Sequence, residues 1–541
     1  MTKQFSNYSD LLTFTRASKG HALRPVSYGT ELVVNGTFDS TDISDWVIAS
    51  SSATVAHDTG GDGGRIAVTT TGSAGNGRVG QDLGQLTAGK AYRVFVDFDK
   101  GTANAVYLRI AQNAAGGTTV KQVIGSGTSG TIEYTFVPAS TAVYYVVLVG
   151  GNTTGHVAYF DNVSVKEVTF DQPDGTLTLF EHPEDIPRVE YDADGNRLGL
   201  LVEEQRVNLI LNSSDFSVGS WTKSGSSISA ATNITAPDGT TNSFKLIESS
   251  STAVHRVEGA SAAGGTTSTM SCFMKKAERK WGNINFSGLG GGNVWFDLEN
   301  GVLGTVGASV TARIEDYGNG WYRCSVTGTP TSSAPTDIKV ANADNTTSYT
   351  GDGTSGIYVF GAQTEAGSFP TSYIKTTGST ATRSADIASI PVADFGYNQS
   401  EGTVVVEAKT FSNAEANHGD FALTDSGTSP DLSSGSRTGS SVAGSYSTWY
   451  KTAGTTQANL VRTSAVEDNV FYKAGFCYKA NDFAQSVDGG SILSDSSGTV
   501  PSRNSVVLIG DNYYGKLNGH IKSIKYYPRR LTNAQLQEIT T

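Results

Sequence analysis

Carboxylates and histidines are the residues that could do acid–base or metal chemistry in this chain, and their spacing supports neither. None of the seven histidines lies three to five residues from another, so the spacing of a helical metal-binding pair is absent. Glycoside hydrolysis needs two carboxylates across a cleft. Glu401 and Glu407 share one expected strand without a third acidic partner, and the adjacent Glu203 and Glu204 point to opposite faces of an extended chain. We therefore expect no enzymatic activity, with a polysaccharide-degrading glycosidase as the less favoured alternative.

Aromatic side chains offer a different chemistry, the binding of sugars. A sugar ring lies on a flat aromatic face while amides and carboxylates bond its hydroxyl groups. The candidate ligand-binding residues that share this property are Trp46, Tyr145, Trp281, Trp449, Tyr450, Tyr513 and Tyr514, with Tyr107 and Tyr144 as further candidates. Tyr144 and Tyr145 are consecutive on a strand, so one faces outward and the other packs inward. For every one of these aromatics a core or rim position remains the alternative.

Oxygen ligands for a cation occur in one turn and one strand. Asp58 directly precedes the glycine-rich turn at residues 59–64, and Asp62 lies within it. Asp161 lies on a later strand. Carboxylates of this kind can hold calcium, and solvated turn residues are the alternative. The sequence therefore predicts that no cofactor is required, with a structural calcium ion at these three residues as an open possibility.

The composition indicates what must position these residues. Only 17% of the 541 residues are charged and 63 are glycine, which disfavours long helices and favours short strands joined by turns. The 23 tyrosines, 22 phenylalanines and 6 tryptophans argue against disorder. At roughly 100–200 residues per domain, the length predicts three or four domains. We expect an all-β protein of several antiparallel β-sandwich (jelly-roll) domains in series, with a short C-terminal helix.

The domain boundaries follow from a near-repeat. Residues 31–38, then Trp46, have the same pattern as residues 208–216, then Trp221: an apolar strand, Asn, small polar residues, Phe and a nearby Trp. This suggests two copies of one sandwich type. The expected domains are an N-terminal anchoring arm at 1–30, a jelly roll at 31–168, a β connector at 169–207, a second jelly-roll sandwich at 208–385 and a third sandwich at 386–541.

Local signals add detail. Thr532 is a helix cap before a short amphipathic segment with Ala534, Leu536 and Ile539. The three cysteines, Cys272, Cys324 and Cys477, are far apart and odd in number, so we expect reduced core thiols instead of a disulfide framework.

The charge and the N-terminus limit the partners and the location. A formal net charge of −12 argues against nucleic acid and against docking on anionic lipid. No run of 18 apolar residues occurs, so we expect no membrane insertion. The first 20 residues hold no apolar run long enough for a signal peptide, which predicts synthesis in a cytoplasm.

Residues 31–167 resemble carbohydrate-binding modules of the family 4/9 type. The residues that carry the resemblance are the opening segment 32–38 with Trp46 and the closing segment 160–165. The resemblance implies a β-jelly roll, and a structural calcium for which Asp161 is the matching carboxylate.

Two further motifs resemble those of bacteriophage and prophage virion proteins. The first is Phe-Thr-Arg-Ala-Ser at 14–18, and the second is the run at 187–208 with Pro-Arg-Val-Glu-Tyr-Asp and Leu-Gly-Leu-Leu-Val-Glu-Glu. The segments at 295–298, 318–324 and 361–374 belong to the same resemblance. Since the two motifs lie far apart, we expect the first jelly roll to be inserted between them, and the arm and the connector to pack together. The resemblance implies a tail fibre, head fibre or spike.

The last domain is similar to concanavalin/laminin-G-type sandwiches, through residues 402–407, the hairpin at 485–490 and the ending at 517–531. The resemblances together imply a virion structural protein that attaches to host-surface glycans through non-catalytic, lectin-like sandwiches. The expected partners are other virion proteins, host surface polysaccharide and further copies of the chain, with a trimer favoured, and the expected location is the virion surface. A purely architectural spacer, capsid-decorating or fibre-docking protein is the alternative. A secreted bacterial lectin or glycosidase appendage is a third.

Overall fold

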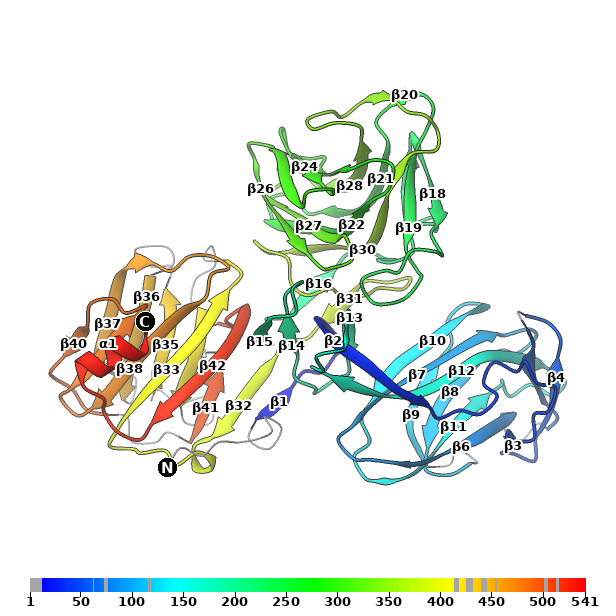
Figure 1. Ribbon diagram of the computed structural model, residues 1–541, viewed down its shortest axis with the longest axis horizontal. Helices are drawn as coiled ribbons and strands as arrows, with labels where there is room; N and C mark the ends of the chain where they lie inside the picture. The colour runs from blue at the N-terminus through cyan, green and yellow to red at the C-terminus, as the bar shows by residue number, and fades with distance from the viewer. Residues whose placement is uncertain are drawn as a thin grey trace. The chain divides into compact units, whose positions relative to one another are not determined.

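A computed structural model describes residues 12–541 apart from 62, 73–75, 115, 117, 413–417, 425–431, 439–444, 453–454, 501–504 and 512–514 (Figure 1). The chain forms two compact units. The inserted unit, Pro25–Thr176, interrupts the main unit, Met1–Arg24 and Leu177–Thr541, as the distant motifs predicted. The regular structure of the described residues is antiparallel β-strand apart from short helical segments, which confirms the all-β expectation, and none of their helices is long and apolar enough to cross a membrane.

The inserted unit is a sandwich of two sheets. The first sheet consists of β10 (Ser129–Phe136), β7 (Ala91–Asp99), β12 (Val157–Phe170) and β2 (Gly20–Glu31), with β5 (Arg65–Thr70) and β4 (Ala53–Asp58) beside β12. The second consists of β3 (Val47–Ile48), β6 (Arg78–Leu86), β11 (Ala142–Val149), β8 (Tyr107–Ala111) and β9 (Thr119–Ile124). Strand alternation builds the core: Tyr92, Val94, Val96 and Phe98 of β7 are buried between the sheets.

The first sandwich of the main unit has two six-stranded sheets. One consists of β17 (Thr222–Ser224), β21 (Arg256–Ala262), β28 (Ala334–Ala341), β23 (Trp281–Phe286), β24 (Asn293–Asp297) and β25 (Val302–Val306). The other consists of β18 (Ser226–Ala230), β19 (Phe244–Glu248), β30 (Gly356–Ala366), β22 (Ser268–Lys276), β27 (Trp321–Gly328) and β26 (Val310–Asp316). Two short pairs accompany them, β16 (Arg206–Asn208) with β31 (Ala381–Arg383) and β20 (Thr252–Ala253) with β29 (Tyr349–Thr350).

Cys272 and Cys324 are opposite each other on β22 and β27 of this sandwich. Both are buried and free, and so is Cys477 in the next sandwich, which confirms the expected reduced core thiols.

The C-terminal sandwich has two seven-stranded sheets. One consists of β1 (Thr13–Thr15), β32 (Ile387–Pro391), β41 (Val506–Ile509), β34 (His418–Thr424), β35 (Leu432–Thr438), β36 (Ser445–Thr452) and β37 (Thr455–Ala465). The other consists of β14 (Val189–Tyr191), β15 (Arg197–Val202), β42 (Gly519–Tyr527), β33 (Glu401–Thr410), β38 (Tyr472–Lys479), β39 (Phe483–Val487) and β40 (Leu493–Asp495). A 3-10 turn, Val392–Asp394, follows β32.

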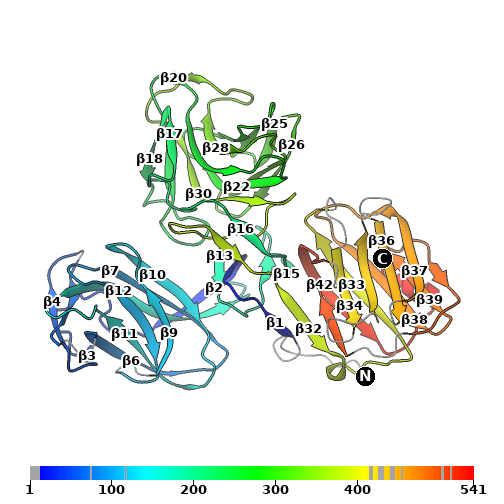
Figure 2. The same ribbon diagram turned by 180° about the vertical axis from the view of Figure 1, so that it is seen from behind.

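The arm and the connector complete this sandwich. From the arm, β1 pairs with β32 and forms one edge of the first sheet. From the connector, β13 (Thr176–His182) continues the sheet of β2, while the β14–β15 hairpin pairs with β42 and forms the edge of the second sheet. Both views show β15 beside β42 and β1 beside β32 (Figures 1 and 2). The β14–β15 hairpin of the connector is therefore part of the C-terminal sandwich.

The one α-helix among the described residues is α1 (Asn533–Ile539), at the expected place. Thr532 accepts a hydrogen bond from the backbone N–H of Gln535, whose side chain accepts one from the backbone N–H of Thr532. This capping box and the burial of Leu536 hold the helix against β38 and β39.

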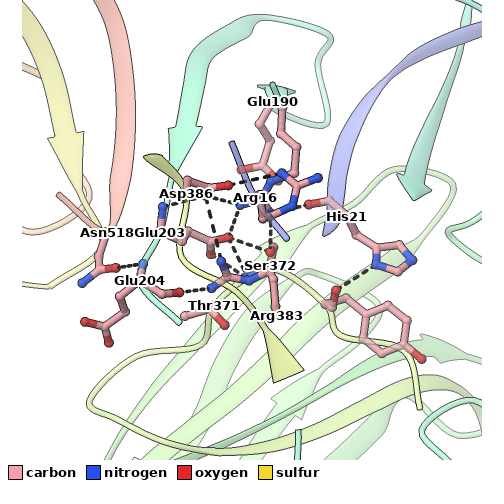
Figure 3. A network of polar contacts seen from close by, with 12 residues as sticks. Arg16, His21, Glu190, Glu203, Glu204, Thr371, Ser372, Arg383, Asp386 and Asn518 are labelled. Atoms are coloured by element: carbon pink, nitrogen blue, oxygen red, sulfur yellow. Dashed lines mark hydrogen bonds and ion pairs between the residues drawn. The ribbon is translucent and has the colours of Figure 1, made fainter. Parts of the chain in front are cut away.

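A buried charge network joins the arm, the connector and the segment between the two sandwiches (Figure 3). It consists of Arg16 after β1, Arg188 before β14, Glu203 after β15, Arg383 at the end of β31 and Asp386 before β32. All five side chains are 0% exposed. Arg188 Nη2 lies 2.8 Å from Glu203 Oε2 and 2.6 Å from Asp386 Oδ2, and Arg16 Nη1 lies 3.2 Å from Asp386 Oδ1. These contacts confirm that the arm and the connector pack together.

Backbone carbonyl groups accept further hydrogen bonds from two of the guanidinium groups. Arg16 donates to the carbonyl oxygens of Ser18 at 2.7 Å and Pro183 at 2.8 Å, and Arg188 donates to that of His21 at 3.0 Å. Three guanidinium groups thus share two carboxylates at a site that bulk solvent does not reach. Burial alone would raise the pKa of Glu203, but Arg383 and Arg188 outweigh it and lower that pKa to about 2.

We expect Arg188→Met to lower the free energy of unfolding of the main unit by about 3–5 kcal/mol, because it leaves Glu203 and Asp386 with less positive charge at a site without solvent. Urea denaturation followed by fluorescence measures the loss. Lys276→Met is the matched control: it breaks the exposed Lys276–Glu299 pair, in which Nζ lies 2.5 Å from Oε1, and such a pair is worth about 0–1 kcal/mol. Equal effects of the two variants would contradict the structural role of the network.

Acid should weaken the same junction through His21. Burial lowers the pKa of His21 to about 4, and its Nδ1 lies 2.8 Å from the carbonyl oxygen of Tyr373. Because the unfolded chain protonates this residue more readily, stability decreases as the pH falls from about 6.5 to about 4, by up to about 3 kcal/mol. Glu203 extends the decrease toward pH 2, since its lowered pKa favours the charged form in the folded state.

His21→Asn keeps a donor for the Tyr373 carbonyl and removes the titration. Melting temperatures of the two proteins between pH 8 and pH 4 test this, and we expect the variant to lose less stability over that range. Parallel curves would show that His21 does not contribute.

Candidate functional site

The outer face of the second sheet of the inserted unit is the surface whose residue types fit a ligand. Strand alternation builds it: Tyr144, Val146 and Leu148 of β11 lie in the core, so Tyr145 and Val147 point to the opposite side. The same alternation on β8, β6 and β9 places a mixed set of side chains on this face. We call the set the outer face, and it consists of Tyr107, Arg109, Arg78, Gly80, Asp82, Gln122, Ile124, Tyr145 and Val147.

The strand register gives the order of these side chains across the face. Tyr145 lies between Asp82 on β6 and Ala111 on β8. At the other end of the same strand pair, Tyr107 is opposite Val149. Since Ala111 and Tyr107 are four residues apart on β8, the two tyrosines are separated by about 13 Å along the strands.

Charged and amide groups lie between the tyrosines. Arg109, on β8 between the two, donates from Nε to Oε1 of Gln122 at 2.6 Å, and its guanidinium carbon lies 6.0 Å from the ring centre of Tyr107. Partial burial and the neighbouring charge of Arg78 lower the pKa of Arg109. At the other end, the charge of Asp82 raises the pKa of Tyr145. The face therefore offers both donors and acceptors beside its aromatic rings.

The loop after β8 crosses the middle of the outer face. A Cβ at Gly116 would lie 3.6 Å from Nη1 of Arg109 and 3.7 Å from Val147, and a Cβ at Gly80 would lie 3.2 Å from the carbonyl oxygen of Ala114. The loop accounts for the burial of Val147 on a face turned away from the core. Tyr107 and Tyr145 remain half-buried at the two ends.

Half-exposed aromatic rings with amide, guanidinium and carboxylate groups between them are suited to sugars. The rings cover the apolar face of a pyranose, while the polar groups donate hydrogen bonds to sugar hydroxyl groups or accept hydrogen bonds from them. Among the sequence candidates, the structure places Tyr145 and Tyr107 on this face. Three further residues of this face, Arg109, Gln122 and Asp82, were not identified from the sequence. The signal that could have found them is the period of two on the strands, combined with the knowledge of which side is buried.

Trp46 lies elsewhere, and its expected role as a ligand platform is corrected. It is 3% exposed, its ring lies 5.4 Å from that of Phe38, and its Nε1 donates to the carbonyl oxygen of Asn35 at 3.3 Å. The indole packs in the core of the sandwich, so neither face of the ring is available to stack on a sugar.

Tyr450 is corrected in the same way. It is 0% exposed and its hydroxyl donates to the carbonyl oxygen of Cys477 at 3.0 Å inside the C-terminal sandwich. Its neighbour Trp449 is half-buried on β36, with Nζ of Lys451 5.0 Å from its ring. Tyr513 and Tyr514 lie outside the described residues.

Trp281 is half-buried on β23 of the other sandwich of the main unit. Nζ of Lys280 lies 5.7 Å from its ring, and a Cβ at Gly304 would lie 2.6 Å from it, so the ring packs over the backbone of β25. The structure does not bring Trp281 and Trp449 together.

The expected calcium ligands are placed as follows. Asp58 accepts hydrogen bonds from Nε of Arg65 at 2.6 Å and from the backbone of Gly60 at 2.9 Å, which lower the pKa of its carboxyl group. Asp161 accepts from the backbone of Asn162 at 2.7 Å. Asp62 lies outside the described residues. In the described part of the chain no group of three or more His, Cys, Asp or Glu side chains could hold a metal ion. The calcium ion stays a prediction.

Comparison with known proteins gives the domain type of the inserted unit. Residues 30–154 match a family model described as a carbohydrate binding domain of the CBM 4/9 type. The inserted unit therefore contains a carbohydrate-binding domain. The search of curated proteins gave no match for the chain.

Several solved structures are similar to parts of the chain. A CBM4 structure is 23% identical over 25% of this chain and 99% of its own, with a TM-score of 0.21. The CBM22-1–CBM22-2 tandem domain of Paenibacillus barcinonensis Xyn10C is 12% identical over 62% and 97%, with a TM-score of 0.22. A heptameric SAP-like pentraxin from Limulus polyphemus is 14% identical over 26% and 70%, with a TM-score of 0.22.

Proposed function

We propose that this protein is a non-catalytic glycan-binding attachment protein whose outer face holds a polysaccharide of the host surface. The observation that carries the proposal is the pair Tyr107 and Tyr145 on one sheet face, with Arg109, Gln122 and Asp82 beside them. Both tyrosines belong to the segment that matches a carbohydrate binding domain.

The absence of catalysis is part of the proposal. Glycoside hydrolysis requires two carboxylates on opposite sides of the scissile bond. Asp82 is the only acidic residue in the five strands β3, β6, β11, β8 and β9, all of which lie in the described part of the chain. A face with one carboxylate can bind a sugar and has no partner to complete an acid–base pair.

The proposal places the protein at the surface of a phage virion, as a tail fibre, head fibre or spike. Its support is the resemblance of the two distant motifs to virion proteins, and the motif residues Arg16, Arg188 and Glu203 meet in the buried network. Weak sites become effective when a homo-oligomer, such as a trimer, presents several of them. Other virion proteins would then be the partners of the main unit. Cryo-microscopy of the assembled particle, with this chain located in it, tests this part.

We expect Tyr145→Ala and Tyr107→Ala each to weaken glycan binding about three- to tenfold, because each removes one stacking face worth about 0.5–1.5 kcal/mol. A glycan array identifies a ligand for the full chain, and titration with that ligand measures each variant. Tyr28→Ala is the matched control: Tyr28 is 40% exposed on the other sheet of the same unit.

Three outcomes would contradict the proposal in different ways. Unchanged affinity in the two variants would remove the outer face as the site. A chain that binds no glycan would favour the purely architectural alternative. Release of oligosaccharides from the bound polysaccharide would show that the protein is a glycosidase.

A further inference from the structure

A cavity of about 350 Å³ lies inside the main unit, where the β14–β15 hairpin, the β26–β27 strands and the sheet of β33 and β42 meet. Its size is at the lower end of the range for small-molecule sites. Polar side chains dominate its wall, among them Glu190, Arg313, Glu315, Tyr317, Lys409 and His520. The cavity shares no residue with the outer face of the inserted unit.

One wall is built by neighbouring strands. Lys409 on β33 is paired with His520 on β42, which is paired with Leu201 on β15. Nε2 of His520 lies 2.6 Å from Oε2 of Glu190, which Figure 3 shows beside the buried charge network. The opposite wall carries Arg313, Glu315 and Tyr317 from the edge of the neighbouring sandwich.

Lys409 is a charged residue of this wall for which the described residues provide no hydrogen-bond acceptor and no ion-pair partner. It is only 9% exposed, and within the described residues its ammonium group takes part in no hydrogen bond or ion pair. The ring centre of Phe471 lies 5.3 Å from its Nζ. Burial lowers the pKa of Lys409, against the opposing charges of Glu190 and Glu315. The stem of Lys409 is buried and its ammonium group has no protein acceptor at the cavity wall, so an occupant that supplies acceptors would be stabilised.

Glu315 is an acceptor for which the described residues provide no hydrogen-bond donor. It is half-buried in the wall, and across the described part of the chain its carboxylate also lacks a hydrogen bond or an ion pair. An occupant must therefore donate to Glu315 and accept from Lys409. Hydroxyl groups do both.

The charges of the wall select against a charged occupant. Six carboxylates of the wall disfavour an anion, namely Glu190, Asp192, Asp194, Glu203, Glu315 and Asp316, and Arg313, Arg323 and Lys409 disfavour a cation. A neutral polyhydroxylated molecule meets neither repulsion and can bond both kinds of group. An apolar molecule would leave the ionised groups without partners.

We propose that this cavity is a second ligand site, which binds a neutral saccharide of one or two residues with Lys409 as hydrogen-bond donor and Glu315 as acceptor. The site does not depend on the proposed function of the outer face. Either site can fail without the other.

The test uses the full chain and four probes: glucose, galactose, N-acetylglucosamine and maltose. Calorimetric titration measures binding, and mass spectrometry measures how far each probe slows acylation of Lys409. We expect at least one probe to bind saturably and to protect Lys409, with affinity reduced at least tenfold in Lys409→Met and in Glu315→Gln. The double variant Tyr107→Ala/Tyr145→Ala should bind the same probe unchanged.

Lys522→Met is the matched control, since Nζ of Lys522 lies 5.0 Å from the same Phe471 ring but is 46% exposed and paired with Glu407. We expect it to keep full affinity. Melting curves confirm folding, and Lys409→Met should melt no lower than the parent, because it removes a charge that has no protein partner. The proposal is overturned if none of the probes protects Lys409, or if binding survives Lys409→Met and is lost in the tyrosine double variant.

Discussion

Three guanidinium groups and two carboxylates share a volume without solvent, and this one arrangement determines how the main unit is assembled. Arg16, Arg188 and Arg383 cannot be buried unless Glu203 and Asp386 are buried with them, because an isolated charge in such a place is far more costly than an exposed one. The five residues come from segments that are up to 370 positions apart in the sequence. Folding must therefore bring the arm, the connector and the segment after β31 to one point before all five charges are matched.

Two consequences follow from this convergence. The arm and the connector lie against Asp386 and so deliver β1 and the β14–β15 hairpin to the two sheets of the C-terminal sandwich, where they form edges. The same hairpin brings Glu190 to His520 and closes one side of the cavity beside Lys409. The polar cavity is thus a product of the assembly and belongs to no single sandwich.

The outer face of the inserted unit has a different physical origin. It depends on strand alternation and register within one sheet, which place Tyr107 and Tyr145 on the side away from the core. The loop through Gly116 then covers the apolar middle of the face and leaves the ring-bearing ends half-exposed. A surface made in this way needs no partner from the rest of the chain, which suits a module that binds its ligand independently.

The amino-acid sequence by itself determined the all-β class, the cap and position of α1, the reduced buried cysteines and the insertion of one unit between the two motifs. These features depend on local propensity, on period-two patterning or on the distance between motifs, all of which are present in a single chain. The tertiary structure alone decided which face of each strand is buried. Alternation assigns the side chains to two faces, but it does not show which of the two faces packs against the core. Trp46 and Tyr450 therefore proved to be core residues, while Arg109 and Gln122 took their places beside Tyr107. The juxtaposition of Lys409, Glu190 and Glu315 arises from segments distant in sequence, and no periodicity within any one of them could indicate it.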